Sequence, residues 1–202
     1  FECFYLCAHS DRPTEKTFLI PKADFSHPEI EEIHRFFFGS TTRNPALSRR
    51  VDELKLELKE ELYHAIEHFQ LDALIAENVL TIPMNIPLGL ALIEVLFETA
   101  IPCIAHHHDF YWERDRFTVN CIRDYLSAAF PPRDDAIEHV VINSQAGKEF
   151  SRRTGLSCRV IPNVMNFEHP PDPIDDYAAD FRRAIGIAED DFLILQPTRI
   201  VP

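Results

Sequence analysis

The chain has 202 residues, of which 46% are hydrophobic and 26% charged, a composition typical of a soluble globular protein with one domain or one domain and part of another. Its 20 basic and 33 acidic residues give a formal charge of −13 at pH 7, which argues against a surface that binds nucleic-acid phosphates. No apolar stretch approaches the roughly 20 residues that span a bilayer, no signal peptide is recognisable, and five cysteines without paired metal-site spacing indicate free thiols in a cytoplasmic protein.

The predicted elements alternate between short apolar strands and helices. In chain order we expect a strand (1–7), a surface connection (10–30), two helices (28–39, 51–69), a strand (71–79), a helix (88–99), a strand (101–109), a helix (117–130), a strand (138–144), a helix (144–155), a strand (158–164), a linker (168–176), a helix (177–187) and a strand (192–198). The helix at 51–69 is the clearest, because its apolar residues recur at helical spacing with charges between them. This order predicts an α/β fold: a Rossmann-like parallel sheet with helices on both faces and right-handed crossovers.

Polar residues end several of the predicted strands. In parallel sheets, ligands bind beyond the carboxyl ends of the strands, so these residues are expected at one rim. They are Glu77, Asn78, His106 to Asp109, Asn143, Ser144, Asn163, Thr198 and Arg199.

The stretch "AHHHD", residues 105–109, has three possible interpretations. On a strand, His106 and His108 point to one face and His107 to the other. Two histidines on one face and Asp109 could bind zinc, but few further ligands are available. The histidines could also be structural residues of a polar strand end, or they could contact a ligand and support charge at a reacting centre.

The ordered series "AHHHD", "VVINSQAGKEFSRRTG", "RVIPNVMNFE" and "FLILQPTRIVP" resembles the family 4 retaining glycosyltransferases. Each motif is loose, and the resemblance depends on their order over nearly the whole chain. It implies two Rossmann-like domains that face each other across a cleft, the GT-B arrangement. Residues 1–169 would form the acceptor-side domain without its first βα unit, and residues 170–202 would form a linker and the beginning of the donor-binding domain. Both ends then look truncated, and this fragment alone is expected to be inactive.

The resemblance also implies roles for individual residues on the donor side. A histidine at a strand end contacts the donor sugar in this family, which matches His108 best, and Asp109 directly follows it as the second catalytic candidate. Ser144, as the expected helix N-cap, and Asn163 become donor-binding candidates, although a serine there is more often only a cap and Asn163 could simply make a turn. Arg199 would bind the donor diphosphate, because a guanidinium stays charged and grips phosphate oxygens in two places.

The sequence departs from the family in the segment "VIPNVMNFE". Val164 stands where the family has Gly and Asn166 where it has Asp, which weakens any precise role for Asn163 and Asn166.

Four residues are candidates for the acceptor side: His106, Asn78, Asn85 and Glu113. His106 shares a face with His108, and the choice between these two histidines stays open. Asn78 ends a strand, where polar residues are common. Asn85 precedes a predicted helix start, and Glu113 follows the histidines within an aromatic and charged stretch.

The function expected from the resemblance is transfer of a sugar from a nucleotide-sugar donor to an unidentified acceptor, with retention of configuration. It implies front-face transfer, with no cofactor, no essential metal and no protein nucleophile, and with the leaving diphosphate stabilised by preorganised positive charge. The alternatives are a non-catalytic sugar- or nucleotide-binding module, a sugar-nucleotide epimerase of the same architecture and, as the last alternative, a metal hydrolase built on the histidines.

Overall fold

The computed structural model describes residues 1–164, 166, 168–169, 173–188 and 190–195. The chain separates into two compact units, Phe1–Asn163 and Val164–Pro202. No helix among the described residues is long and apolar enough to cross a membrane.

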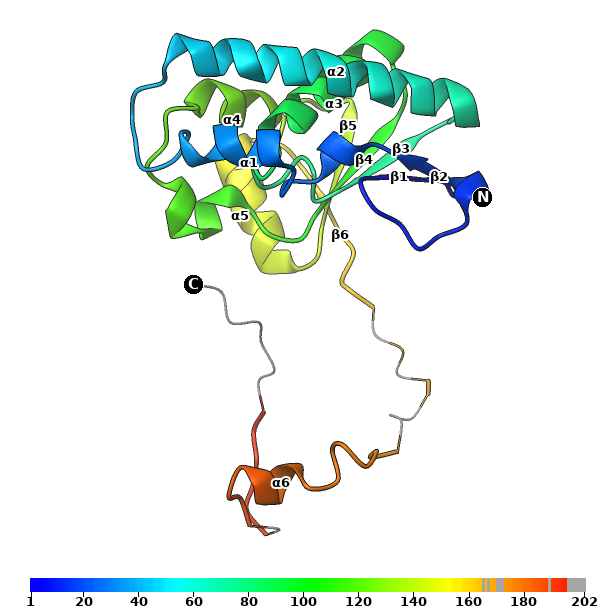
Figure 1. The fold of residues 1–202 in the computed structure, drawn as a ribbon, viewed down its shortest axis with the longest axis vertical. Helices are drawn as coiled ribbons and strands as arrows, with labels where there is room; N and C mark the ends of the chain where they lie inside the picture. The colour runs from blue at the N-terminus through cyan, green and yellow to red at the C-terminus, as the bar shows by residue number, and fades with distance from the viewer. Residues whose placement is uncertain (165, 167, 170–172, 189, 196–202) are drawn as a thin grey trace. The chain divides into compact units, whose positions relative to one another are not determined.

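The first unit is built on a parallel sheet of four strands in the order β3-β4-β5-β6 (Figure 1). These strands are β3 (Leu74–Glu77), β4 (Cys103–His107), β5 (Ile137–Val141) and β6 (Arg159–Val160). The helices α3 (Ile86–Thr99), α4 (Arg123–Ala129) and α5 (Ser144–Thr154) connect them in turn, so each pair of neighbours is a βαβ unit. The predicted α/β class, with a parallel sheet flanked by helices, is confirmed.

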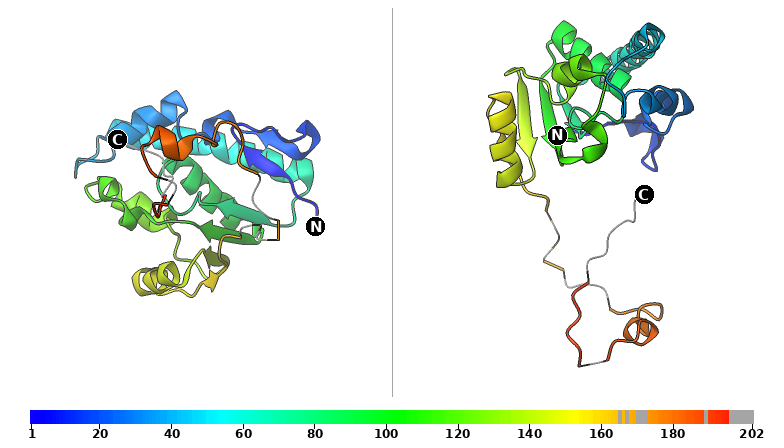
Figure 2. Two further views of the ribbon diagram at one scale, coloured as in Figure 1. Left: turned by 90° about the horizontal axis from the view of Figure 1, so that it is seen from below. Right: turned by 90° about the vertical axis from the view of Figure 1, so that its left-hand side faces the viewer.

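The core lies on one face of this sheet. Ala76, Cys103, Ala105 and Ile137 are buried there among the apolar side chains of α2 (Pro45–Phe69) and α3. A smaller apolar cluster of Phe110, Val141, Ala146 and Phe150 joins α5 to the sheet. On the opposite face, Ile75 and Ile104 are 64% and 39% exposed. Figure 2 shows α2 (cyan) well separated from α5 (yellow) in both views.

Helix α2 has the amphipathic pattern that the sequence predicts. It buries Val51, Leu54, Leu58, Leu62 and Ala65 on the side that packs against α3. It begins earlier than predicted because Asn44 caps it, accepting a hydrogen bond from the Ala46 amide at 2.9 Å, and Pro45 suits the first helical position.

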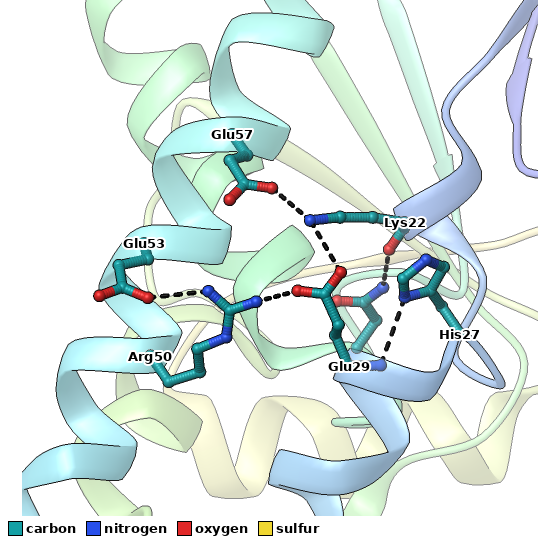
Figure 3. A network of polar contacts seen from close by, with 7 residues as sticks. Lys22, His27, Glu29, Arg50, Glu53 and Glu57 are labelled. Atoms are coloured by element: carbon teal, nitrogen blue, oxygen red, sulfur yellow. Dashed lines mark hydrogen bonds and ion pairs between the residues drawn. The ribbon is translucent and has the colours of Figure 1, made fainter.

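A network of charged side chains fastens the segment before α2 to its exposed face (Figure 3). Glu29 of α1 (Pro28–Arg35) pairs with Lys22 at 3.0 Å and with Arg50 of α2. Lys22 also reaches Glu57, and Arg50 reaches Glu53 at 2.8 Å. These groups are partly exposed, so each pair contributes at most about 1 kcal/mol, and the network mainly sets the position of α1.

The structure differs from the sequence predictions in several elements. Residues 10–30, expected to be a plain connection, contain β2 (Thr17–Leu19), which pairs in parallel with β1 (Tyr5–Cys7), because the chain folds back and buries Ile20. The helix predicted at 117–130 is shortened to α4, because Asn120 bonds the Phe117 carbonyl and the Ile122 amide and so forms a turn before it. Short 3₁₀ turns lie at Thr14–Lys16, Pro21–Ala23, Tyr111–Glu113 and Asp115–Phe117.

The second unit contains one short helix among its described residues, α6 (Phe181–Ala184), within the predicted 177–187. The strand predicted at 192–198 is not formed at residues 192–195, and its remainder lies outside the described residues. Whether residues 170–202 begin a donor-binding domain stays a prediction.

Candidate functional site

The candidate site lies where β3 and β4 end side by side. Glu77, the last residue of β3, is the register partner of His106 in β4, so their side chains lie on the same face of the sheet. His108 follows two residues later. The Nδ1 atom of His106 is 2.9 Å from Oε2 of Glu77, and Nε2 of His108 is 3.3 Å from the same oxygen. The structure therefore brings both predicted histidines to one carboxylate.

This cluster is open to solvent. The side chains of Glu77 and His108 are 62% and 41% exposed, whereas that of His106 is 20% exposed. The imidazole rings of His106 and His108 lie with their centroids 4.7 Å apart. His108 is therefore the more accessible of the two histidines, and the choice between them as the contacting residue stays a prediction.

Asn78 positions the chain between the two strand ends. It adopts a left-handed backbone conformation with φ of 58°, and its amide donates to the His106 carbonyl at 2.9 Å. Its side-chain oxygen accepts a hydrogen bond from the His108 amide at 3.1 Å, and its NH₂ group donates to Asp109 at 3.2 Å. Asn78 thus holds the backbone of His108.

Asp109 is held by its neighbours. Its Oδ2 atom accepts a hydrogen bond from Nε of Arg114 at 2.6 Å, and its Oδ1 atom faces Asn78. Both carboxylate oxygens are therefore engaged within the protein. In this structure Asp109 fixes the loop that follows β4, next to the predicted catalytic His108.

Behind the open cluster lies a buried histidine pair that the sequence did not predict. His107 and His139 are 0% and 2% exposed, and their Nε2 and Nδ1 atoms are 2.9 Å apart. The other nitrogen of His107 meets the hydroxyl of buried Thr81 at 2.6 Å. Burial, with a smaller contribution from charge repulsion by the other histidines, lowers the pKa of His107 to about 3. Burial lowers the pKa of His139 to about 4, so both rings are neutral at pH 7.

The histidine pair packs against aromatic rings near the strand ends. Phe110 and Phe150 flank His107, with ring centroids 5.1 and 5.7 Å from it. Since His107 lies between His106 and His108 in the chain, its buried packing determines where those two side chains emerge. The strict alternation of side chains along a strand was the signal that one of the three histidines faces inward.

Ser144 is not the N-cap of α5, which corrects the prediction. Asn143 is the cap, and its side chain accepts a hydrogen bond from the Ala146 amide at 2.8 Å. Ser144 is the first helical residue and is exposed. Asn143 can reach the Ala146 amide because it is the extended residue before the first helical turn, the position that a cap requires.

Two of the acceptor-side candidates have structural roles. Asn85 is buried, caps α3 through the Leu88 amide, and donates to the carbonyls of Lys22 and Ala23. All its polar atoms are engaged, so its amide is not free for a ligand. Glu113 is exposed and accepts a hydrogen bond from the Phe110 amide at 3.2 Å.

The two remaining donor-side candidates are Asn163 and Arg199. Asn163 is exposed and is the last residue of the first unit. Arg199 lies outside the described residues, as does Thr198.

Two curated relatives are similar to the chain. A mannosylglucosylglycerate synthase of Petrotoga mobilis is 39% identical over 146 residues, which are 70% of this chain and 34% of that protein. A mannosylglucosylglycerate synthase of Thermotoga maritima is 35% identical over 182 residues, which are 87% of this chain and 41% of that protein. The chain thus spans between a third and about two fifths of the length of these relatives. No family model and no solved structure matches it significantly.

Proposed function

We propose that this chain is part of a glycosyltransferase that moves a sugar from a nucleotide-sugar donor to an acceptor with retention of configuration. The observation that supports this most strongly is the identity of 35–39% to two proteins named as mannosylglucosylglycerate synthases, which are glycosyltransferases. The relatives' names extend the proposal to a mannosyl donor and a glucosylglycerate acceptor. The reaction is proposed to need no cofactor and no essential metal.

In this proposal His108 contacts the donor sugar. Its imidazole is exposed at the carboxyl edge of a parallel sheet, the place where such sheets bind ligands. A neutral or protonated imidazole there can hydrogen-bond a sugar hydroxyl and support charge at the reacting carbon. Asn78 holds the His108 backbone, and Asp109 fixes the loop beyond it.

The proposal assigns the leaving diphosphate to Arg199. A guanidinium remains charged at all physiological pH values and can bind two phosphate oxygens at once. Positive charge that is in place before reaction stabilises the negative charge that develops as the sugar leaves. This role rests on the sequence resemblance alone, because Arg199 lies outside the described residues.

The test is a transfer assay of the complete protein with a panel of nucleotide sugars and with glucosylglycerate as acceptor. We expect His108→Ala to lower kcat by about 100-fold, the effect typical of removing one preorganised group, without lowering the melting temperature. The matched control is His64→Ala, which removes an exposed histidine on α2. Wild-type turnover by His108→Ala would refute the assignment, and nucleotide-sugar binding without any transfer by the wild type would indicate a non-catalytic binding module.

A further inference from the structure

We propose that Glu77, His106 and His108 form a binding site for a divalent transition-metal ion such as Zn²⁺. Within the part of the chain that the structure describes, these three residues are the one group of potential ligands whose atoms all lie within 4.8 Å of one another. The site differs from the zinc site that the sequence hinted at, because Glu77 of the neighbouring strand replaces Asp109 as the carboxylate.

The distances fit a small metal ion. Zinc binds imidazole nitrogen and carboxylate oxygen at about 2.0–2.2 Å, so two ligands of a tetrahedral site lie roughly 3.3–3.5 Å apart. The Glu77 oxygen is 2.9 Å from His106 Nδ1 and 3.3 Å from His108 Nε2. The nitrogens of His106 and His108 lie within 4.8 Å of each other, so the two rings need to approach by at most about 1.5 Å to reach this spacing.

The surrounding structure holds the three ligands in place. Glu77 and His106 are register partners on adjacent strands, so their backbones are fixed by the sheet. The His108 amide is hydrogen-bonded to the Asn78 side chain. Ligands on rigid elements, supported by hydrogen bonds around them, lose little freedom when a metal binds.

The ligand set selects the type of metal. Two imidazoles and one carboxylate suit Zn²⁺, Cu²⁺, Ni²⁺ or Co²⁺, whereas Mg²⁺ and Ca²⁺ prefer oxygen ligands alone. Because Glu77 and His108 are exposed, a fourth position is open to water. Sites with three protein ligands and one open position are reactive or exchangeable rather than purely structural.

A bound metal would occupy the nitrogen of His108 that faces Glu77. If His108 contacts the donor sugar, as the proposed function states, the metal then competes with that contact and inhibits transfer. This consequence rests on the proposed function, whereas metal binding itself does not.

The experiment is isothermal titration of the chelator-treated complete protein with ZnCl₂, with Co²⁺ as an optical probe of the coordination. We expect one ion per chain with a Kd of about 10 μM or tighter, about 7 kcal/mol. Glu77→Gln, His106→Asn and His108→Asn should each weaken binding at least tenfold. Glu77→Gln is nearly isosteric, the two His→Asn changes remove one ring each, and circular dichroism checks that each variant is folded.

The matched control is the double variant His64→Asn/His68→Asn. These two exposed histidines are four residues apart on α2, a spacing that can also bind metal weakly. The double variant should bind Zn²⁺ with the same stoichiometry and Kd as the wild type. Loss of binding in this variant but not in His108→Asn would overturn the proposal, as would a wild type that binds no ion. If zinc binds with the expected stoichiometry but does not inhibit transfer, the metal site is supported and the proposed role of His108 in transfer is refuted.

Discussion

The buried pair His107 and His139 predicts that the folded protein loses stability on mild acidification. Both rings are neutral in the fold, so one ring donates a hydrogen bond to the other across the 2.9 Å between Nε2 of His107 and Nδ1 of His139. Protonating both rings would place two N–H groups against each other in a space without water. In the unfolded chain, by contrast, each ring is solvated and binds a proton near the reference pKa of 6.5.

The sign and size of the effect follow from this difference. The folded pKa values, about 3 and about 4, lie below the unfolded value, so the unfolded state binds more protons between pH 6.5 and about pH 4. The stabilising contribution is complete above pH 6.5 and is lost as the pH falls. Each histidine lowers the free energy of unfolding by about 2 kcal/mol between pH 7 and pH 5, and the two together lower it by about 4 kcal/mol. That is a large part of the 5–15 kcal/mol that typically stabilises a domain.

Between pH 7 and pH 5 the stability changes because histidines titrate, whereas carboxylates contribute only at lower pH. Aspartates and glutamates whose folded pKa is lowered, such as Glu94, destabilise the fold only when the pH falls below their unfolded value of about 4.5. Burial also lowers the pKa of His34, so His34 adds to the loss of stability as the pH falls. The contribution of the pair therefore has to be isolated by substitution.

The assay is urea denaturation at pH 5, 6, 7 and 8 in buffer with a chelator. His139→Asn removes one of the two titrating rings, so we expect its free energy of unfolding to fall by about 2 kcal/mol less than that of the wild type between pH 7 and pH 5. His64→Asn, which removes an exposed ring, should follow the wild-type curve. The reasoning is refuted if His139→Asn and the wild type lose the same stability over this range.

Three further substitutions test the packing and capping that the structure shows. Gly89→Ala should lower the free energy of unfolding by about 1–2 kcal/mol, because the new Cβ would lie 2.4 Å from the buried ring of Phe130. This overpacking outweighs the gain of about 1 kcal/mol in helix propensity. A higher melting temperature of the variant would contradict this prediction. Asn143→Ala should cost about 1 kcal/mol and Ser144→Ala less than about half of that, because Asn143 caps α5; the reverse order in chemical denaturation would show that the cap is misassigned.

Local pattern was enough to predict the fold class and its principal helix. The spacing of Val51, Leu54, Leu58 and Leu62 determines which face of α2 is apolar, and this pattern needs no information from the rest of the chain. The alternation of strands and helices implied a parallel sheet, and hence that polar strand ends meet at one edge. Short elements such as β2 were missed, because pairing with a distant segment and not their own sequence makes them strands.

The candidate site was predictable only in part. Alternation along β4 predicted that His107 faces the opposite side from His106 and His108, but the segment does not indicate which residues these histidines contact. Glu77 precedes His106 by 29 residues, and His139 follows His107 by 32, so both contacts depend on how the strands align in the sheet. The capping of α5 was placed one residue too late, since Asn and Ser are both favourable caps and only the backbone geometry distinguishes them.

By itself, the sequence determined the α/β class, the amphipathic helix and the strand ends that carry polar side chains, because these depend on residue periodicity over short distances. The tertiary structure alone decided that one histidine of the triplet is buried against His139, that the other two share Glu77, and that Asn78 holds His108. These contacts join strands far apart in the chain, and strand register and side-chain packing, which no local pattern encodes, bring them together.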